Sequence, residues 1–181
     1  MSNQHPSRFL ALALFCAITA LAFVPETAAA AEPGMTDFRH PQHNFSLSYP
    51  QDWRLASFRD GPDFHALSAA GKGPEECNVN VTSAPGTDYL DRISQGRMLN
   101  TIRGTIKDAT FNEWRRQTLG RRWGVYYIVT GTTPRQNYRQ TTLGYQIIVG
   151  PKLYTFSCSA PLARFDQNRA LFEKILATLA F

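Results

Sequence analysis

Residues 109–160 read ATFNEWRRQTLGRRWGVYYIVTGTTPRQNYRQTTLGYQIIVGPKLYTFSCSA, and this stretch decides the fold. It consists of one β-rich run after another, separated by short turn signals. The breaks fall at three places, Gly120-Arg121, Thr133-Pro134 and Gly150-Pro151. Because short breaks between strands favour antiparallel hairpins over crossover connections, the stretch predicts a continuous antiparallel sheet.

Three shorter strands are predicted upstream, over residues 44–49, 63–69 and 77–82. In the first, Phe45, Leu47 and Tyr49 alternate with serines, which is the period of a half-buried strand. The proline at position 50 cannot donate to a sheet ladder and ends this strand. The preceding residues 32–42 are polar and contain proline, so we expect a loose leader there.

Two helices complete the predicted order of elements. Thr87 or Asp88 is a suitable N-cap for a helix that runs to about Arg103, where Gly104 follows as a stop signal. A second helix closes the chain and has its apolar residues on one stripe: Phe165, Phe172, Ile175, Leu176 and Leu179. The resulting order β-β-β-α-β-β-β-β-α predicts an α+β fold, an antiparallel sheet flanked by two main helices.

The N-terminus has the three-part order of a secretory signal peptide. Arg8 supplies positive charge, residues 10–24 form an uncharged apolar run, and small residues follow at 28–31. The run has 15 residues, fewer than the roughly 18–20 that cross a bilayer. We therefore predict a signal peptide over residues 1–31, cleaved after Ala30 or Ala31. Residues 32–181 then form one domain, without a membrane span, in the periplasm or outside the cell.

The charge and the cysteines narrow the class of protein further. The formal net charge of +5 is too modest for a dedicated nucleic-acid-binding protein. Two cysteines, Cys77 and Cys158, remain after removal of the signal peptide. An even number of cysteines in an exported chain predicts a disulfide between them.

The pattern resembles the PsbP-like superfamily, which includes the PsbP subunits of photosystem II and the DcrB-type bacterial envelope proteins. The resemblance is carried by residues 45–53, FSLSYPQDW, an alternating aromatic strand followed by a proline and a tryptophan. It is carried also by the C-terminal end, with Tyr154 and Phe156 on a strand and a helix that closes on Phe181. The resemblance implies a sheet between helical layers (an α/β/α sandwich) and a role in binding or assembly rather than catalysis.

An arginine group is the feature that most favours a binding function. Arg115, Arg116, Arg121 and Arg122 lie within eight residues around a predicted hairpin turn. Arginine clusters suit recognition of carboxylates or phosphates. The alternative is a solvated sheet edge that resists aggregation.

Catalytic and metal-binding motifs are weak in this sequence. It contains no G-x-S-x-G, S-x-x-K or H-E-x-x-H motif and no phosphate-binding loop. His40 and His43 could offer two metal ligands with His65 as a third, but they fall in a predicted loop without a cysteine nearby. We therefore expect surface histidines, no bound metal and no other cofactor.

These observations predict a non-enzymatic envelope protein that binds or helps assemble a protein partner, or docks on an anionic surface. Nucleic acid is not an expected partner. Two alternatives stay open. One is a small-ligand carrier with a pocket between sheet and helix. The other is an enzyme with a site around His65 and Cys158, in which the histidine would activate the thiol.

Overall fold

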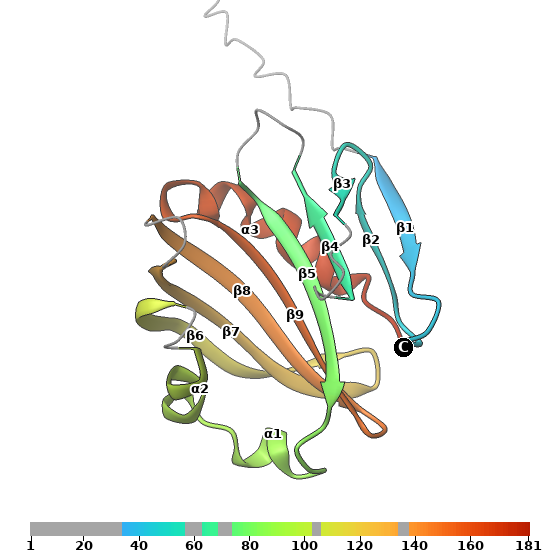
Figure 1. The fold of residues 1–181 in the computed structure, drawn as a ribbon, viewed down its shortest axis with the longest axis vertical. Coiled ribbons are helices and arrows are strands. Elements are labelled where there is room, and N and C mark those ends of the chain that lie inside the picture. The colour runs from blue at the N-terminus through green and yellow to red at the C-terminus, as the bar shows by residue number, and fades with distance from the viewer. Residues whose placement is uncertain (1–33, 57–62, 69–73, 103–105, 134–137) are drawn as a thin grey trace, which may run out of the picture. The chain divides into compact units, whose positions relative to one another are not determined.

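A computed structural model describes residues 34–56, 63–68, 74–102, 106–133 and 138–181. The predicted signal peptide, the predicted helix end at Arg103 and Gly104, and Pro134 lie outside these residues. The larger sheet has seven strands in the spatial order β3-β4-β5-β9-β8-β7-β6 (Figure 1). Its strands are β3 (Arg54–Leu55), β4 (Phe64–Leu67), β5 (Glu76–Ser83), β6 (Lys107–Leu119), β7 (Arg122–Thr132), β8 (Arg139–Val149) and β9 (Lys152–Pro161).

The four strands at the centre and one edge of this sheet are the ones that residues 109–160 predict. Each consecutive pair, β6–β7, β7–β8 and β8–β9, is antiparallel. Gly120 and Gly150 lie at the first and third turns, with φ angles of 59° and 58°. This left-handed conformation favours glycine, because a Cβ atom would meet the neighbouring carbonyl. The three predicted hairpins are confirmed.

Helices cover both faces of the sheet, so the predicted α+β fold is confirmed. The helix α3 (Leu162–Ala177) packs across β8 and β9 on one face (Figure 1). There it buries Phe172 and Ile175 in one apolar core with Tyr126 of β7. The helices α1 (Tyr89–Arg92) and α2 (Gln95–Ile102) bury Leu90 and Met98 in a second core with Tyr127. Since consecutive strand residues point to opposite faces, the neighbours Tyr126 and Tyr127 enter different cores.

The predicted helix from position 87 or 88 to Arg103 is wrong in its continuity. The chain leaves α1 at Ile93, which has an extended conformation with φ −71° and ψ 134°. It re-enters a helix after Ser94, whose carbonyl accepts the N–H of Met98 and whose hydroxyl accepts the N–H of Arg97. A serine inside an apparent helix can thus act as a new N-terminal cap.

The predicted loose leader over residues 32–42 is also wrong. The strand β1 (Met35–Arg39) pairs antiparallel with β2 (Ser46–Pro50) in a separate two-stranded sheet. Its anchor is Phe38, whose ring centroid lies 4.9 Å from that of Phe64. One aromatic residue among polar neighbours gives little alternation in the sequence, so only the tertiary contact defines this strand. No helix in the described ranges is long and apolar enough to cross a membrane.

Candidate functional site

The structure separates the first two residues of the predicted arginine group. Arg115 and Arg116 are consecutive on β6, so their side chains point to opposite faces of the sheet. The guanidinium of Arg115 lies 3.7 Å from the ring centroid of Tyr126 and forms an ion pair with Glu113. The guanidinium of Arg116 lies 3.1 Å from Asp91. Both arginines are therefore engaged within the protein.

The other two arginines remain available at the turn. We call Arg121, Arg122 and Trp123 the hairpin tip, because they follow Gly120 at the turn between β6 and β7. Both arginines are exposed, and neither forms an ion pair with a described residue. Trp123 is 37% exposed although it is a large apolar residue. The tip thus presents two positive charges that have no acidic partner among the described residues. Trp123 follows Arg122 on β7 and points to the opposite face, where the guanidinium of Arg116 lies 4.5 Å from its ring centroid.

A long stretch without acidic residues surrounds the hairpin tip. The 52 residues from Trp114 to Phe165 contain eight lysines or arginines and no aspartate or glutamate. The acidic partners of the nearby arginines therefore come from outside this stretch, as Glu113 and Asp91 do. This asymmetry is readable from the sequence and favours an anionic ligand at this end of the sheet.

A charged network fixes the base of this hairpin to α3. Arg169 of α3 contacts Glu113 of β6 at 2.6 Å and Glu173 at 3.1 Å. Tyr126 of β7 donates a hydrogen bond of 3.1 Å to Glu173. Burial together with Glu173 raises the pKa of Tyr126 to about 12. Burial alone would raise the pKa of Glu113, but the hydrogen bonds from Arg169 and Arg115 outweigh it and lower that pKa.

The two cysteines form a disulfide, which is the pairing that the sequence predicts. Cys77 on β5 and Cys158 on β9 are directly opposite each other, and both are completely buried. His65 of β4 lies opposite Asn78, so it points to the other face of the sheet from Cys77. Its Nε2 lies 3.0 Å from Glu76. The alternative of a thiol site formed by His65 and Cys158 is therefore wrong for the oxidised protein.

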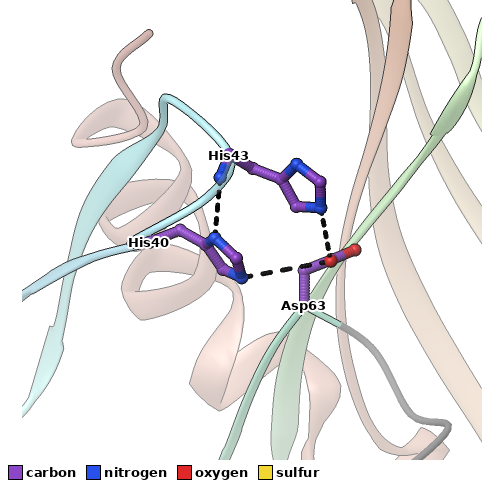
Figure 2. Close-up of side chains that lie close together, drawn as sticks. All are labelled: His40, His43 and Asp63. Atoms are coloured by element: carbon purple, nitrogen blue, oxygen red, sulfur yellow. Dashed lines mark hydrogen bonds and ion pairs between the residues drawn. The ribbon is translucent and has the colours of Figure 1, made fainter.

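The histidines His40 and His43 do come together, but with Asp63 rather than His65 (Figure 2). The two histidines lie in the turn between β1 and β2, and Asp63 directly precedes β4. Nε2 of His43 is 2.9 Å from Asp63 Oδ1, and Nε2 of His40 is 4.0 Å from the same oxygen. The sequence could not show this, because Asp63 lies 20 positions after His43.

This cluster has the residue types of a metal site. Its hydrogen bonds, however, place the ring protons on the Nε2 atoms, which are the atoms that would have to bind the metal. Nδ1 of His40 accepts the backbone N–H groups of Gln42 and His43, at 3.1 and 2.9 Å. Nδ1 of His43 faces the ammonium of Lys152 at 2.8 Å. Both Nδ1 atoms are therefore acceptors, and in the neutral rings each Nε2 carries the proton. A histidine that binds a metal through Nε2 needs that nitrogen without a proton, so these hydrogen bonds do not favour a metal at His40, His43 and Asp63.

One equivalent of Zn²⁺ should accordingly leave the melting temperature unchanged to within about 1 °C, because only a ligand that binds the native state raises it. Isothermal titration calorimetry should detect no stoichiometric uptake. One tightly held zinc per purified chain, lost on substitution of His40, would contradict this prediction.

The hollows lined by described residues are small and open to solvent. Two of them lie beside α3, with volumes of about 240 and 280 Å³. Two others, beside α1–α2 and beside the C-terminus, have volumes of about 300 and 320 Å³. A site that encloses a small molecule has about 300–1,000 Å³ and buries most of its ligand, whereas these open hollows lie at or below the lower end of that range. These hollows give no support to the small-ligand carrier.

Comparison with known proteins finds similarity in structure only. No family model and no curated protein sequence matches the chain. The solution structure of cyanobacterial PsbP (CyanoP) from Synechocystis sp. PCC 6803 is similar at a TM-score of 0.57 and 15% identity, over 87% of this chain and 98% of that one.

Two further solved structures have comparable similarity. PA94 from Pseudomonas aeruginosa, a protein of unknown function described as a putative regulator, has a TM-score of 0.54 and 15% identity over 81% of this chain and 96% of its own. LpqN of Mycobacterium tuberculosis, involved in cell envelope biogenesis, has a TM-score of 0.53 and 14% identity over 81% of this chain and 90% of its own. At this identity the likeness establishes the fold alone: the chain has the PsbP-like fold.

Proposed function

We propose that this chain is an exported, non-enzymatic envelope protein that binds an anionic partner through the hairpin tip. Export is supported by the signal-peptide pattern at residues 1–31 and by the buried disulfide, which suits an oxidising compartment. A binding role is supported by the absence of catalytic motifs from the sequence and by a PsbP-like neighbour, LpqN, that takes part in envelope biogenesis.

The observation that carries the proposal is the pair of exposed arginines at the hairpin tip, Arg121 and Arg122. Arg115 and Arg116 have acidic partners within the protein, whereas Arg121 and Arg122 have none among the described residues. Arginine is enriched at the interface positions that dominate binding energy, and its planar fork of donors matches carboxylates and phosphates. The partner, a protein or the envelope surface itself, would offer carboxylates or phosphates.

The double variant Arg121→Glu/Arg122→Glu should bind the envelope partner about tenfold more weakly, or worse, because reversal turns two attractions into repulsions. Its melting temperature should stay close to that of the wild type, since exposed substitutions cost within about 0.5 kcal/mol. Capture from a native envelope extract, at low and at high salt, measures the effect. Wild-type capture should also weaken with salt, which screens exposed charges.

Arg39→Glu/Arg54→Glu provides the matched control, with the same change of net charge. These arginines are exposed on β1 and β3, and no described residue forms an ion pair with either. This control should bind as the wild type does. Equal capture by the wild type and the tip variant at low salt would mean that the hairpin tip is only a solvated sheet edge.

A further inference from the structure

The cluster of His40, His43 and Asp63 joins parts of the chain that are far apart in sequence. The turn that carries the histidines connects β1 to β2, and Asp63 begins the segment that enters β4 (Figure 2). The carboxylate of Asp63 is itself fixed, because its Oδ2 accepts the N–H of Val81 at 2.6 Å. Lys152, the first residue of β9, reaches His43 from a third strand. Among the described residues, these side-chain contacts fasten the turn to the seven-stranded sheet.

The fastening depends on both histidines being neutral. A proton on Nδ1 of His40 would face two backbone N–H groups that now donate to that atom. A proton on Nδ1 of His43 would face the ammonium of Lys152. The two rings are stacked with centroids 4.7 Å apart, so two positive charges there would also repel each other.

The other groups at the cluster offset this repulsion only in part. Asp63 supplies one negative charge, and that charge is shared between two histidines. Lys152 adds a positive charge, and Tyr154 of β9, whose pKa is raised by burial and by Asp63, stays neutral. Protonation of both rings would therefore place three cations around a single carboxylate.

The turn also covers an apolar part of the core. The ring of His40 stacks on Phe45 with centroids 5.3 Å apart, and Phe45 is only 2% exposed. Phe45 and Phe181 also line the hollow of about 320 Å³ beside the C-terminus. Displacement of the turn would uncover Phe45 and enlarge this hollow.

We propose that His40, His43, Asp63 and Lys152 form a proton-sensitive latch. Neutral histidines hold the turn between β1 and β2 on the sheet, and their protonation releases the turn and uncovers Phe45. The latch is independent of the hairpin tip and of the function proposed for it. It would let an exported protein change its surface when its surroundings become acidic.

The direction of the pH dependence follows from His40. Burial and the neighbouring His43 lower its pKa, and the opposing effect of Asp63 does not restore it. Below about pH 6.5 the unfolded chain binds a proton that native His40 does not bind. The latch therefore contributes stability above about pH 6.5, and this contribution is lost as the pH falls toward the lowered native pKa.

Nuclear magnetic resonance of the full exported protein tests the latch at the atoms concerned. Imidazole ¹⁵N shifts at about pH 7.5 should show both histidines with the proton on Nε2. Hydrogen-exchange protection factors of the Gln42 and His43 amides should fall at least about tenfold between pH 7.5 and pH 5. A proton on Nδ1 of either ring at neutral pH, or unchanged protection at pH 5, would overturn the proposal.

A pair of variants separates the latch from general acid sensitivity. In His40→Asn/His43→Gln, an asparagine oxygen can accept the same backbone N–H groups, and glutamine can bridge Lys152 and Asp63 without titrating. This variant should keep its protection at pH 5. The control His65→Gln removes a histidine on the face of the seven-stranded sheet opposite Cys77. At pH 5 it should lose hydrogen-exchange protection as the wild type does. Equal loss in all three proteins would overturn the proposal, and the wild-type titration decides it if the double variant does not fold.

Discussion

Reduction of the Cys77–Cys158 disulfide should lower the free energy of unfolding by about 4 kcal/mol and the melting temperature by about 8–16 °C. The bond closes a loop of large entropy, because 81 positions separate the two cysteines in sequence. It also joins β5 to β9, the pairing that connects the N-terminal strands to the C-terminal hairpin. The loss should therefore affect the whole sheet and not one local turn.

Urea denaturation with and without reductant measures this effect, and the Cys77→Ala/Cys158→Ala variant provides the control. The variant should resemble the reduced protein and should not respond to reductant. Its stability should be slightly lower still, because both side chains are completely buried and their removal leaves a cavity. A loss of under about 1 kcal/mol on reduction would contradict the loop-entropy argument.

Arg164→Met should destabilise the protein by about 3 kcal/mol, although the arginine itself is partly exposed. The reason is its partner Glu75, which is only 2% exposed and lies 2.9 Å from the guanidinium. A hydroxyl hydrogen bond from Ser68, at 3.0 Å, would remain. One neutral donor does not compensate a buried carboxylate, so removal of the counter-charge leaves an unpaired charge in the interior.

The double variant Glu75→Gln/Arg164→Met distinguishes this explanation from a simple loss of packing. It removes the charge together with its partner, and its stability should lie within about 1 kcal/mol of the wild type. Arg97→Met on α2 is a matched control, because Arg97 is exposed and should cost within about 0.5 kcal/mol. Equal destabilisation by the single and the double variant would mean that Arg164 acts only through its apolar stem.

Sequence reasoning was most successful where local signals and burial agree. The hairpins of residues 109–160 are bounded by glycines and prolines, and the central strands β7 and β8 are apolar enough to be buried on both faces. It failed where an element depends on a single contact that the residue pattern does not reveal. The strand β1 is anchored by Phe38 against Phe64, and the break between α1 and α2 depends on the cap at Ser94.

The sequence also shows each candidate site only in part. The arginine group is visible in sequence, but strand alternation and the partners Glu113 and Asp91 leave only Arg121 and Arg122 uncompensated. The histidine pair is also visible in sequence, but neither Asp63 nor Lys152 could be assigned to it. Those contacts form only when β4 and β9 are placed beside the β1–β2 turn.

The sequence by itself determined the antiparallel sheet, its three hairpins, the terminal helix and the choice of Cys77 and Cys158 as the disulfide pair. These features follow from periodicity, turn residues and cysteine number, which act over a few residues or are simple counts. Only the tertiary structure decided which charges are compensated, and which nitrogen of each histidine carries its proton. Those properties depend on hydrogen bonds and ion pairs between distant strands, because the energy of a buried polar group is set by the atoms that surround it.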